Sequence, residues 1–565
     1  MSQEKRALLA TVLSMAVLLT WYVFLSPPQP PSGQVDPGAL QQEPWAVAET
    51  AQIPALQEAQ VGTQADPSAA VEAGEERIFI LENEFSRVKI TNAGARVISW
   101  RLLEYTGAEG YPLELVPPHQ DRPELLPLDL VVPGDGARTK RLNEVLYVCS
   151  ESEYGPRGIE ITCRWADGHS EAVEKTLALP ESGYLASVRI SAAPAAGPMP
   201  LLVWAPGLTK GEHRTRSRMS AGLRLALSQG RKVKRVNAED AGSMWRAPEE
   251  VAAWAGVEED YFAAVFIPDE APARFALYGL DRNDEHPQEV GVGWQPGGSG
   301  SALLFVGPKS YDLLGSIDRE LNLGLQRLID YGFFEVIVVG LFWALKKLHG
   351  FTGSYGMAII ALTILIKLAF YPITQRSMVS MRKMQKQMKR LQPRIQHLKD
   401  QYARKQKSIE NRQKLNQEMM ALYKRENVNP MAGLTGCLPM LLQIPILWGF
   451  YNLLSVAIEL RRAPFLYLDD LSARDPYFIT PIVMGLTMFI QQRMTGMATP
   501  DPAQRWLLNI MPLMMTFLFI NFPSGLVLYW LVSNLLGIGQ QYLINRKADA
   551  AEVAPARGRA AMKRA

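Results

Sequence analysis

Several long apolar stretches, with one strongly basic segment between them, occupy the second part of the chain, and this pattern limits the possible folds more than any other feature. Five stretches have the length and composition of membrane spans, at about 355–374, 433–457, 477–493, 507–522 and 524–544. Inside a bilayer every backbone polar group needs a partner within the protein, so such stretches fold as helices. We therefore expect a helical membrane domain over residues 351–545.

A sixth span is expected near the N-terminus, where Lys5 and Arg6 precede 19 residues without a charge. A cleavable signal peptide is the alternative, but its apolar region is usually shorter and no cleavage site of the A-x-A type follows. We favour an uncleaved signal anchor over residues 1–25. Residues 26–75 are rich in Pro, Gln, Ala and Gly and poor in aromatic residues, which is typical of a disordered linker.

The stretch YGFFEVIVVGLFWALKKLHG at 331–350 competes with these spans. It offers only ten apolar residues between Glu335 and Lys346, too few to cross a bilayer. Its aromatic residues and flanking charges suit an amphipathic helix that lies in the membrane interface. We expect such an interfacial helix within residues 321–350.

The distribution of lysine and arginine predicts the orientation of the chain. Residues 376–428 contain 15 Lys or Arg against 4 Asp or Glu, whereas the loop 458–476 has three Arg and four acidic residues. Cytoplasmic loops carry the basic excess. With Lys5 and Arg6 inside, the domain before residue 320 lies outside. The basic segment and the basic tail 546–565 then lie inside. The prediction is a polytopic α-helical membrane protein with six transmembrane helices and both termini in the cytoplasm.

The basic segment also has a helical pattern, because Met, Leu and Ile recur at intervals of three to four residues on both sides of the polar stretch KDQYARKQK. We expect two antiparallel amphipathic helices that form a cytoplasmic hairpin over residues 375–428. Its lysines and arginines favour contact with anionic lipids. Docking of ribosomal RNA or of a targeting factor is an open alternative for the same charges.

Residues 76–320 read as a soluble β domain. Ten strand-like segments with turn residues between them recur there: RIFIL, SRVKITN, ARVISW, LYVCSES, GIEITCRW, YLASVRISA, LLVWAP, YFAAVFIP, RFALYGL and SALLFVGP. Their alternation predicts a mostly antiparallel β-sandwich. The four histidines of the domain are scattered, without metal-ligand spacing or a nucleophile motif. A scaffold or partner-docking role is favoured, and sugar binding stays open.

Cys149 and Cys163 lie at equal distances from the turn EYGPRG and would face each other in a simple hairpin. An oxidising compartment permits a bridge between them, but we expect two unpaired cysteines. With Cys437, the three cysteines are too few for a zinc cluster or a disulfide scaffold. No metal or other cofactor is expected.

Lys367 lies inside the span 355–374, five residues before Pro372. A lysine at this depth can extend its side chain to the headgroups. A central lysine costs about 2.5–3.5 kcal/mol, however, and such residues usually face a bundle interior or a water-filled cavity. Thr363 lies four residues earlier on the same helical face. The other spans contribute further polar residues that would line one hydrated cavity or hold helices together: Gln443, Ser533, Asn534 and Gln540.

Three stretches resemble the YidC–Oxa family of membrane protein insertases: YPITQRSMVSMRKMQ, QEMMALYKRENVNPMAGLTGCLPMLLQIPI and FPSGLVLYWLVSNLLGIGQQ. The resemblance is specific over residues 320–545. It extends more weakly to the signal anchor and to the β domain, which looks like the family's periplasmic β-supersandwich. The resemblance implies a protein of the bacterial inner membrane that inserts nascent membrane proteins and helps them to fold, without acting as an enzyme.

The resemblance also implies a hydrophilic groove, open to the cytoplasm and to lipid, with a single positive charge. That charge falls on Lys367, where the family usually has arginine. The implied groove residues are Thr363, Lys367, Gln443, Tyr529, Trp530, Ser533 and Asn534. The implied partners are the Sec translocon, the ribosome and the signal recognition particle system, the last two through the hairpin and the basic tail.

Two rival functions remain at this point. A small-anion transporter or channel would use Lys367 as its binding charge, but the outer halves of the spans carry no charges. A membrane-tethered sugar-binding domain would require residues 76–320, whereas an insertase would need little of that domain. Five further spans and a basic hairpin are more than an anchor needs.

Overall fold

The computed structural model describes residues 69–562, except for 108–109, 118–124, 156–157, 194–198, 210–221, 231, 281–287, 298–299, 404–408, 427–437 and 496–501. All of the described residues belong to the compact unit Glu58–Ala565. The expected signal anchor and all but the end of the expected linker lie outside the described residues.

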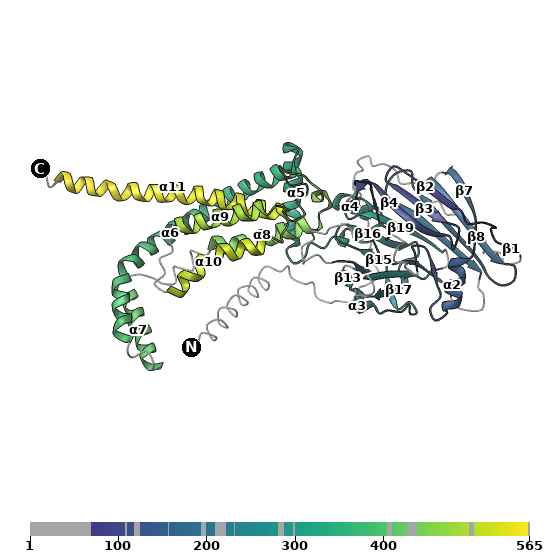
Figure 1. Cartoon of the computed structure of the whole chain (residues 1–565), viewed down its shortest axis with the longest axis horizontal. Coiled ribbons are helices and arrows are strands. Elements are labelled where there is room, and N and C mark those ends of the chain that lie inside the picture. Colours follow the sequence, from purple (N-terminus) through teal and green to yellow (C-terminus); the bar gives the residue numbers. More distant parts are fainter. Residues whose placement is uncertain are drawn as a thin grey trace, which may run out of the picture. The chain divides into compact units, whose positions relative to one another are not determined.

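The first half of the described chain is rich in antiparallel strands (Figure 1). In the described part of the chain, the largest sheet has the order β1 (Ala70–Val71), β8 (Gly158–Asp167), β9 (Ala172–Leu179), β10 (Leu185–Ala193), β19 (Ser301–Pro308), β16 (Phe262–Pro268), β15 (Ala255–Glu258), β12 (Arg224–Gln229) and β13 (Lys232–Val236). The strand β7 (Val148–Gly155) also pairs with β8. This arrangement confirms the expected antiparallel, sheet-rich domain.

Two smaller sheets complete the β domain. One has the order β14 (Glu250–Ala252), β17 (Ala273–Leu280), β18 (Glu289–Trp294), β11 (Leu201–Trp204) and β6 (Leu130–Val131). The other has the order β2 (Ile78–Glu82), β3 (Ser86–Thr91), β4 (Arg96–Thr106) and β5 (Pro112–Glu114). Two short helices, α2 (Gly136–Glu144) and α3 (Ala238–Ala241), lie between strands in the sequence.

Large aromatic side chains fill the space between the sheets. The rings of Trp100 on β4 and Trp204 on β11 are 5.8 Å apart, and those of Phe266 on β16 and Trp294 on β18 are 6.2 Å apart. All four side chains are almost completely buried. Burial of one such aromatic side chain contributes about 1.5–3 kcal/mol, so these contacts between sheets hold the layers together.

The cysteine prediction is half right. Cys149 on β7 and Cys163 on β8 are directly opposite in the antiparallel register, as the hairpin pattern predicts. The expectation that they stay unpaired is wrong, because the two residues form a disulfide. Directly opposed residues bring their Cβ atoms within about 5 Å of each other, so no backbone movement is needed to join the two sulfurs.

A helical connection leads from the β domain to the helical core. It consists of α4 (Tyr311–Leu321), the 3₁₀ turn η2 (Leu325–Leu328) and α5 (Glu335–Thr352). The helix α5 covers most of the expected interfacial stretch. Val338, Leu341 and Leu345 are buried, while Val336 and Trp343 on the same helix are exposed. One apolar side of α5 therefore packs on the protein and another apolar side is left uncovered, as suits a helix at a membrane surface.

The helical core contains α6 (Tyr355–Ala403), α7 (Ile409–Arg425), α8 (Leu438–Val456), η4 (Ile458–Leu460), α9 (Ile479–Thr495), α10 (Pro502–Phe519) and α11 (Ser524–Met562). Among the described residues, the helix over Tyr355–Tyr402 is the one long and apolar enough to cross a membrane, with a mean hydropathy of 2.0 in its best window. Leu442–Val456 and Asn509–Phe519 are shorter apolar helices. The count of six spans therefore stays a prediction.

The helix α6 is longer than expected. It does not end near Pro372 but continues through Pro372 and Pro393 into the hairpin. The hydroxyl of Thr374 lies 3.1 Å from the carbonyl oxygens of both Phe370 and Tyr371, which supports the turn around the first proline. In the hairpin, Leu391 and Ile395 of α6 are buried against the methionine and aromatic side chains of α7.

Candidate functional site

Polar side chains of α8 and α11 meet inside the helical core. The side-chain amide of Gln443 on α8 donates a hydrogen bond to the hydroxyl of Tyr529 and lies 3.4 Å from the hydroxyl of Ser533, both on α11. Tyr529 and Ser533 are four residues apart and therefore share one face of that helix. We name Gln443, Tyr529 and Ser533 the polar cluster.

The phenol of Tyr529 is held in place by its surroundings. Its ring stacks on Phe450 of α8 with a centroid distance of 4.3 Å and an interplanar angle of 21°. Tyr529 and Ser533 are buried, whereas Gln443 is half-buried. The cluster therefore presents hydrogen-bonding groups from an otherwise apolar pair of helices, and Gln443 is its most accessible member.

The helices α6 and α11 pack against each other and run in the same direction (Figure 1). The side-chain amide of Gln540 donates to the hydroxyl of Thr374 at 3.1 Å. Eight residues further along α6 and five residues further along α11, the guanidinium of Arg382 donates to the side-chain oxygen of Asn545 at 2.6 Å. The contact of Gln540 with Thr374 sets the register of the pair, because the long side chain of Arg382 can reach a residue at another level.

That register sets the level of Lys367 relative to the polar cluster. Two parallel helices rise equally per residue. Lys367 lies seven residues before Thr374 on α6, and Ser533 lies seven residues before Gln540 on α11, so Lys367 and Ser533 are at the same height along the two helices. By the same step, Thr363 is level with Tyr529. Thr363, Lys367 and Thr374 recur at intervals of four and seven and so lie on one face of α6, the face that meets α11. Lys367 thus shares the level of the cluster.

Lys367 differs from the other polar residues of the core because it has no hydrogen bond or ion pair to any residue that the structure describes. Its side chain is half-buried. Thr363 is completely buried, and its hydroxyl donates to the carbonyl of Ile359 one turn earlier, at 2.6 Å. The hydroxyl of Thr363 is therefore already hydrogen-bonded within its own helix, whereas the ammonium group of Lys367 can bind another group.

Two of the expected groove residues lie apart from the cluster. Trp530 packs its ring 5.1 Å from that of Phe519 on α10. Asn534 points its amide toward α9, at 3.5 Å from the carbonyl of Met484 and 3.4 Å from the hydroxyl of Thr487. In the structure both residues connect α11 to its neighbours on another side. For Asn534 this is the interhelical role that the sequence left open.

Sequence reasoning missed the contacts that set the helix register. Nothing in the sequence marks Thr374, Arg382 or Asn545 as special, and Gln540 is only one polar residue among several in its span. The one available signal was the face that Thr374 shares with Lys367. The apolar partner of Tyr529, Phe450, had no signal beyond its place in an apolar run.

The chain is similar to known proteins along almost its whole length. The family model described as 60Kd inner membrane protein matches residues 347–551, and the model of the YidC periplasmic domain matches residues 80–344. A membrane protein insertase YidC from Syntrophus aciditrophicus is 33% identical over 96% of this chain and 100% of its own length. Its counterpart from Oleidesulfovibrio alaskensis is 34% identical over 97% and 100%. A crystal structure of an active YidC insertase covers 84% of this chain and 94% of its own, with 16% identity and a TM-score of 0.36.

Proposed function

We propose that this chain, which belongs to the YidC family of membrane protein insertases, receives the polar end of a nascent membrane protein beside Lys367. As a member of that family it is an inner-membrane protein with a periplasmic domain. The observation that carries the proposal is the half-buried Lys367, which has no partner among the described residues and lies level with the polar cluster.

A cation in such a position attracts a negatively charged segment. Near a protein surface, two opposite charges 4 Å apart attract each other by about 4 kcal/mol. The amide of Gln443 and the hydroxyls of Tyr529 and Ser533 would offer hydrogen bonds to the same segment. Together these groups would lower the cost of bringing a charged or polar tail into the membrane. Lysine acts here as a point charge, without the planar fork that arginine would offer.

The mechanism needs no bond chemistry. A nascent segment first meets the cytoplasmic hairpin and then enters the groove, where its acidic tail is held beside Lys367. Transfer of its apolar residues into lipid supplies the driving force, at about 25 cal/mol per Å². The membrane potential adds about 2.3 kcal/mol per charge per 100 mV when a negative tail moves outward.

The proposed topology has six spans, with both termini in the cytoplasm. The charges of the loops support it, because the basic hairpin and the basic tail both fall on the cytoplasmic side. The disulfide between Cys149 and Cys163 also supports it, since disulfides persist in the bacterial periplasm and are rare in the cytosol. The β domain would therefore be exported.

The proposed partners follow from the surface of the hairpin. Lys383, Lys389 and Arg390 are exposed on α6. Basic side chains so placed suit ribosomal RNA, the signal recognition particle system and anionic headgroups. Cooperation with the Sec translocon belongs to the same proposal, and the family resemblance is what supports it.

The test replaces Lys367 by Arg, Ala or Glu in cells depleted of their own insertase. Insertion is scored for a single-span client with an acidic outer tail. We expect Arg to support insertion, Ala to reduce it, and Glu to reduce it most, because Glu repels the tail. The control client has the same span and a neutral tail, and it should be much less sensitive. Equal insertion of the acidic client by all three variants would contradict the proposal.

A further inference from the structure

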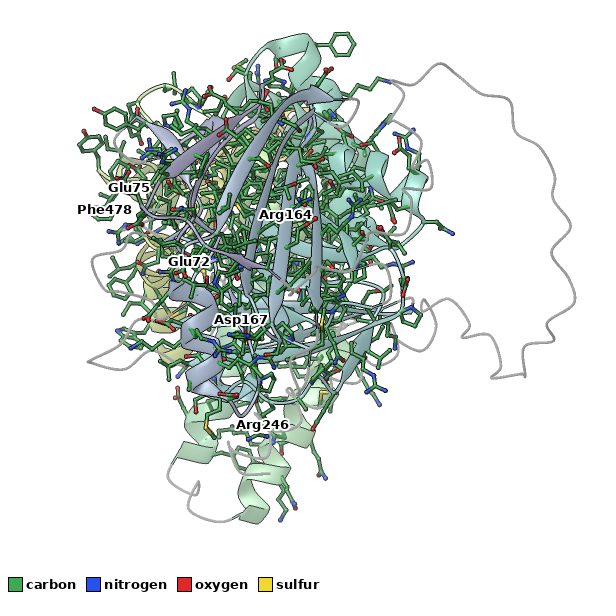
Figure 2. All side chains as sticks on the ribbon, turned by 90° about the vertical axis from the view of Figure 1, so that its right-hand side faces the viewer. Glu72, Glu75, Arg164, Asp167, Arg246 and Phe478 are labelled. Atoms are coloured by element: carbon green, nitrogen blue, oxygen red, sulfur yellow. A yellow bond between two sulfur atoms is a disulfide. The ribbon has the colours of Figure 1, made fainter. Side chains whose placement is uncertain are left out.

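The loop between α8 and α9 exposes large apolar side chains. Leu466 is 85% exposed and Tyr477 is 67% exposed. Phe478 is also exposed and lies at the periphery of the molecule in the view of Figure 2. Scattered apolar residues on a surface need no explanation, but a contiguous group indicates an interaction site. The loop can therefore act as an interaction site only if these three side chains lie close together on one surface.

The first part of the loop is a tight turn with its tip held outward. Phe465 and Leu468 exchange two backbone hydrogen bonds of 2.8 and 2.9 Å. Leu466, between them, has a φ of 55°, in the left-handed region that bulky side chains rarely adopt. The ring of Phe465 occupies the space beside Gly356 of α6, where even a Cβ atom would come within 2.1 Å of it. The turn is thus anchored on α6, and Leu466 projects from it.

Asp475 joins the two parts of the loop. Its carboxylate accepts hydrogen bonds from the hydroxyl of Tyr467 at 2.8 Å, the backbone N–H of Tyr477 at 2.9 Å and the backbone N–H of Thr480 at 2.7 Å. The rings of Tyr467 and Tyr477 are 6.2 Å apart. Because Leu466 precedes Tyr467 and Phe478 follows Tyr477, this ring contact brings the exposed residues Leu466, Tyr477 and Phe478 into one neighbourhood. We name these three side chains the apolar tip.

The apolar tip continues an exposed stripe along α9. Ile479, Ile482, Val483 and Leu486 are all exposed. Their spacing of three and four residues places them on one face. The helix has 17 residues and is therefore about 26 Å long, shorter than the roughly 30 Å of a bilayer's hydrocarbon core. The apolar tip directly precedes the first residue of α9 and therefore lengthens the apolar band at the N-terminal end of this helix.

We propose that lipids of the outer leaflet cover the apolar tip, so that the loop between α8 and α9 acts as an interfacial anchor. Continuity with the stripe of α9 points to lipid as the occupant. Tyrosine is enriched where membrane meets water, because its ring is apolar and its hydroxyl is wet. Asp469, exposed on the same loop, marks the side that stays in water. The inference rests on the proposed topology, which makes α9 a membrane span and places this loop at the outer surface.

The test measures the depth of single residues in vesicles of phosphatidylethanolamine and phosphatidylglycerol. The full chain carries Cys437→Ser together with Leu466→Cys, Asp469→Cys or Met244→Cys, and each new cysteine receives a nitroxide spin label. Met244 on the β domain is an exposed apolar residue that the proposal leaves in water. Collisions with oxygen, which concentrates in lipid, are compared with collisions with a water-soluble nickel chelate.

We expect a several-fold higher ratio of oxygen to nickel collisions at position 466 than at 469 or 244. A label at 466 that meets nickel as often as the label at 469 would overturn the inference. A label shielded from both reagents would overturn it too, since a protein surface would then cover the tip. Labelling of Asp469→Cys in whole cells by a membrane-impermeant maleimide tests the topology separately, so its failure is distinguishable from failure of the lipid contact.

Discussion

Gln443 on α8 donates a hydrogen bond from its side-chain amide to the hydroxyl of Tyr529 on α11, across 86 positions in the sequence. This bond joins two helices that are otherwise packed through apolar side chains. The bond also holds the side-chain amide of Gln443 at the level of Lys367. The proposed groove therefore depends on this bond for its structure and for the placement of its hydrogen-bonding groups.

Replacement of Tyr529 by Phe removes this bond and keeps the stacking on Phe450. We expect the free energy of unfolding to fall by about 1 kcal/mol, the usual contribution of one hydrogen bond, and insertion of acidic-tailed clients to fall. Thermal unfolding in detergent and the insertion assay measure the two effects. Tyr451→Phe is the matched control, because Tyr451 is a buried tyrosine of the same core whose hydroxyl has no hydrogen bond to a described residue. Equal effects of both variants would show that the hydroxyl of Tyr529 has no special role.

The disulfide predicts the number of reactive thiols. The chain has three cysteines, and Cys149 and Cys163 are bonded. The membrane-inserted protein, denatured without reductant, should therefore take up maleimide at Cys437 alone, and at all three cysteines after reduction. Mass spectrometry counts the adducts. Three adducts without reductant would mean that the bond does not form in the cell.

Loss of the same disulfide should destabilise the β domain. Cys149→Ser opens a loop of about 15 residues, for which chain entropy gives about 3 kcal/mol. We expect the variant to be cleaved faster by protease within the β domain. Cys437→Ser leaves the bond intact and is the control. Equal protease resistance of the two variants would contradict a stabilising role.

Glu258 connects the β domain to the segment that enters the membrane domain. Its carboxylate is completely buried and lies 2.8 Å from the guanidinium of Arg235. The guanidinium of Arg224 and the ammonium of Lys309 are each 3.1 Å from the same carboxylate. The same Arg235 donates to the carbonyl oxygens of Arg327 and Leu328 in η2. Removal of one partner from such a buried network costs about 3–5 kcal/mol, which is the expected effect of Glu258→Gln.

The control for this variant is Glu250→Gln, which breaks a partly exposed pair with Lys234 and should cost about 1 kcal/mol or less. Chemical denaturation followed by the fluorescence of the buried tryptophans compares the two. If both variants lose the same small amount, the network of Glu258 does not stabilise the domain.

The same network predicts a dependence of stability on pH. Burial by itself would raise the pKa of Glu258, but the charges of Lys309, Arg235 and Arg224 outweigh it and hold that pKa below its ordinary value. The unfolded state therefore takes up the proton first as the pH falls. The stabilisation is present above about pH 4.5 and is lost below it. Denaturation between pH 7 and pH 3 should show a steeper loss for the wild type than for Glu258→Gln.

Ten strand segments were predictable from their sequence pattern, and other strands, β9 and β18 among them, were missed. All ten expected segments overlap strands of the structure. The strand β9, with the sequence AVEKTLAL, was missed because its Ala, Glu, Lys and Leu have low β propensity. It is nevertheless central in its sheet, since β8 and β10 both pair with it. In β18, Gly291 and Gly293 weaken the strand pattern but leave room for the ring of Trp245.

The sequence allows the candidate site residues to be named, but it does not allow their arrangement to be predicted. Helical periodicity places Thr363 and Lys367 on one face, and this needs only the sequence. Which helix that face meets, and in which register, depends on contacts such as Gln540 with Thr374, which are remote in the chain. A single sequence holds no information on such pairs. Trp530 and Asn534, for example, are expected in the groove from the resemblance, and only the structure shows that they contact α10 and α9.

The most direct test of the central claim exchanges Lys367 with its neighbour Leu368. Leu368 is exposed on the surface of α6, so the double variant Lys367→Leu with Leu368→Lys keeps the composition, hydropathy and depth of the charge and changes only its direction. We predict that insertion of the acidic-tailed client is lost, because the ammonium group no longer lies on the face that meets α11. Insertion at the wild-type level would contradict the account, since a lysine that merely reaches for the headgroups works equally well from either position.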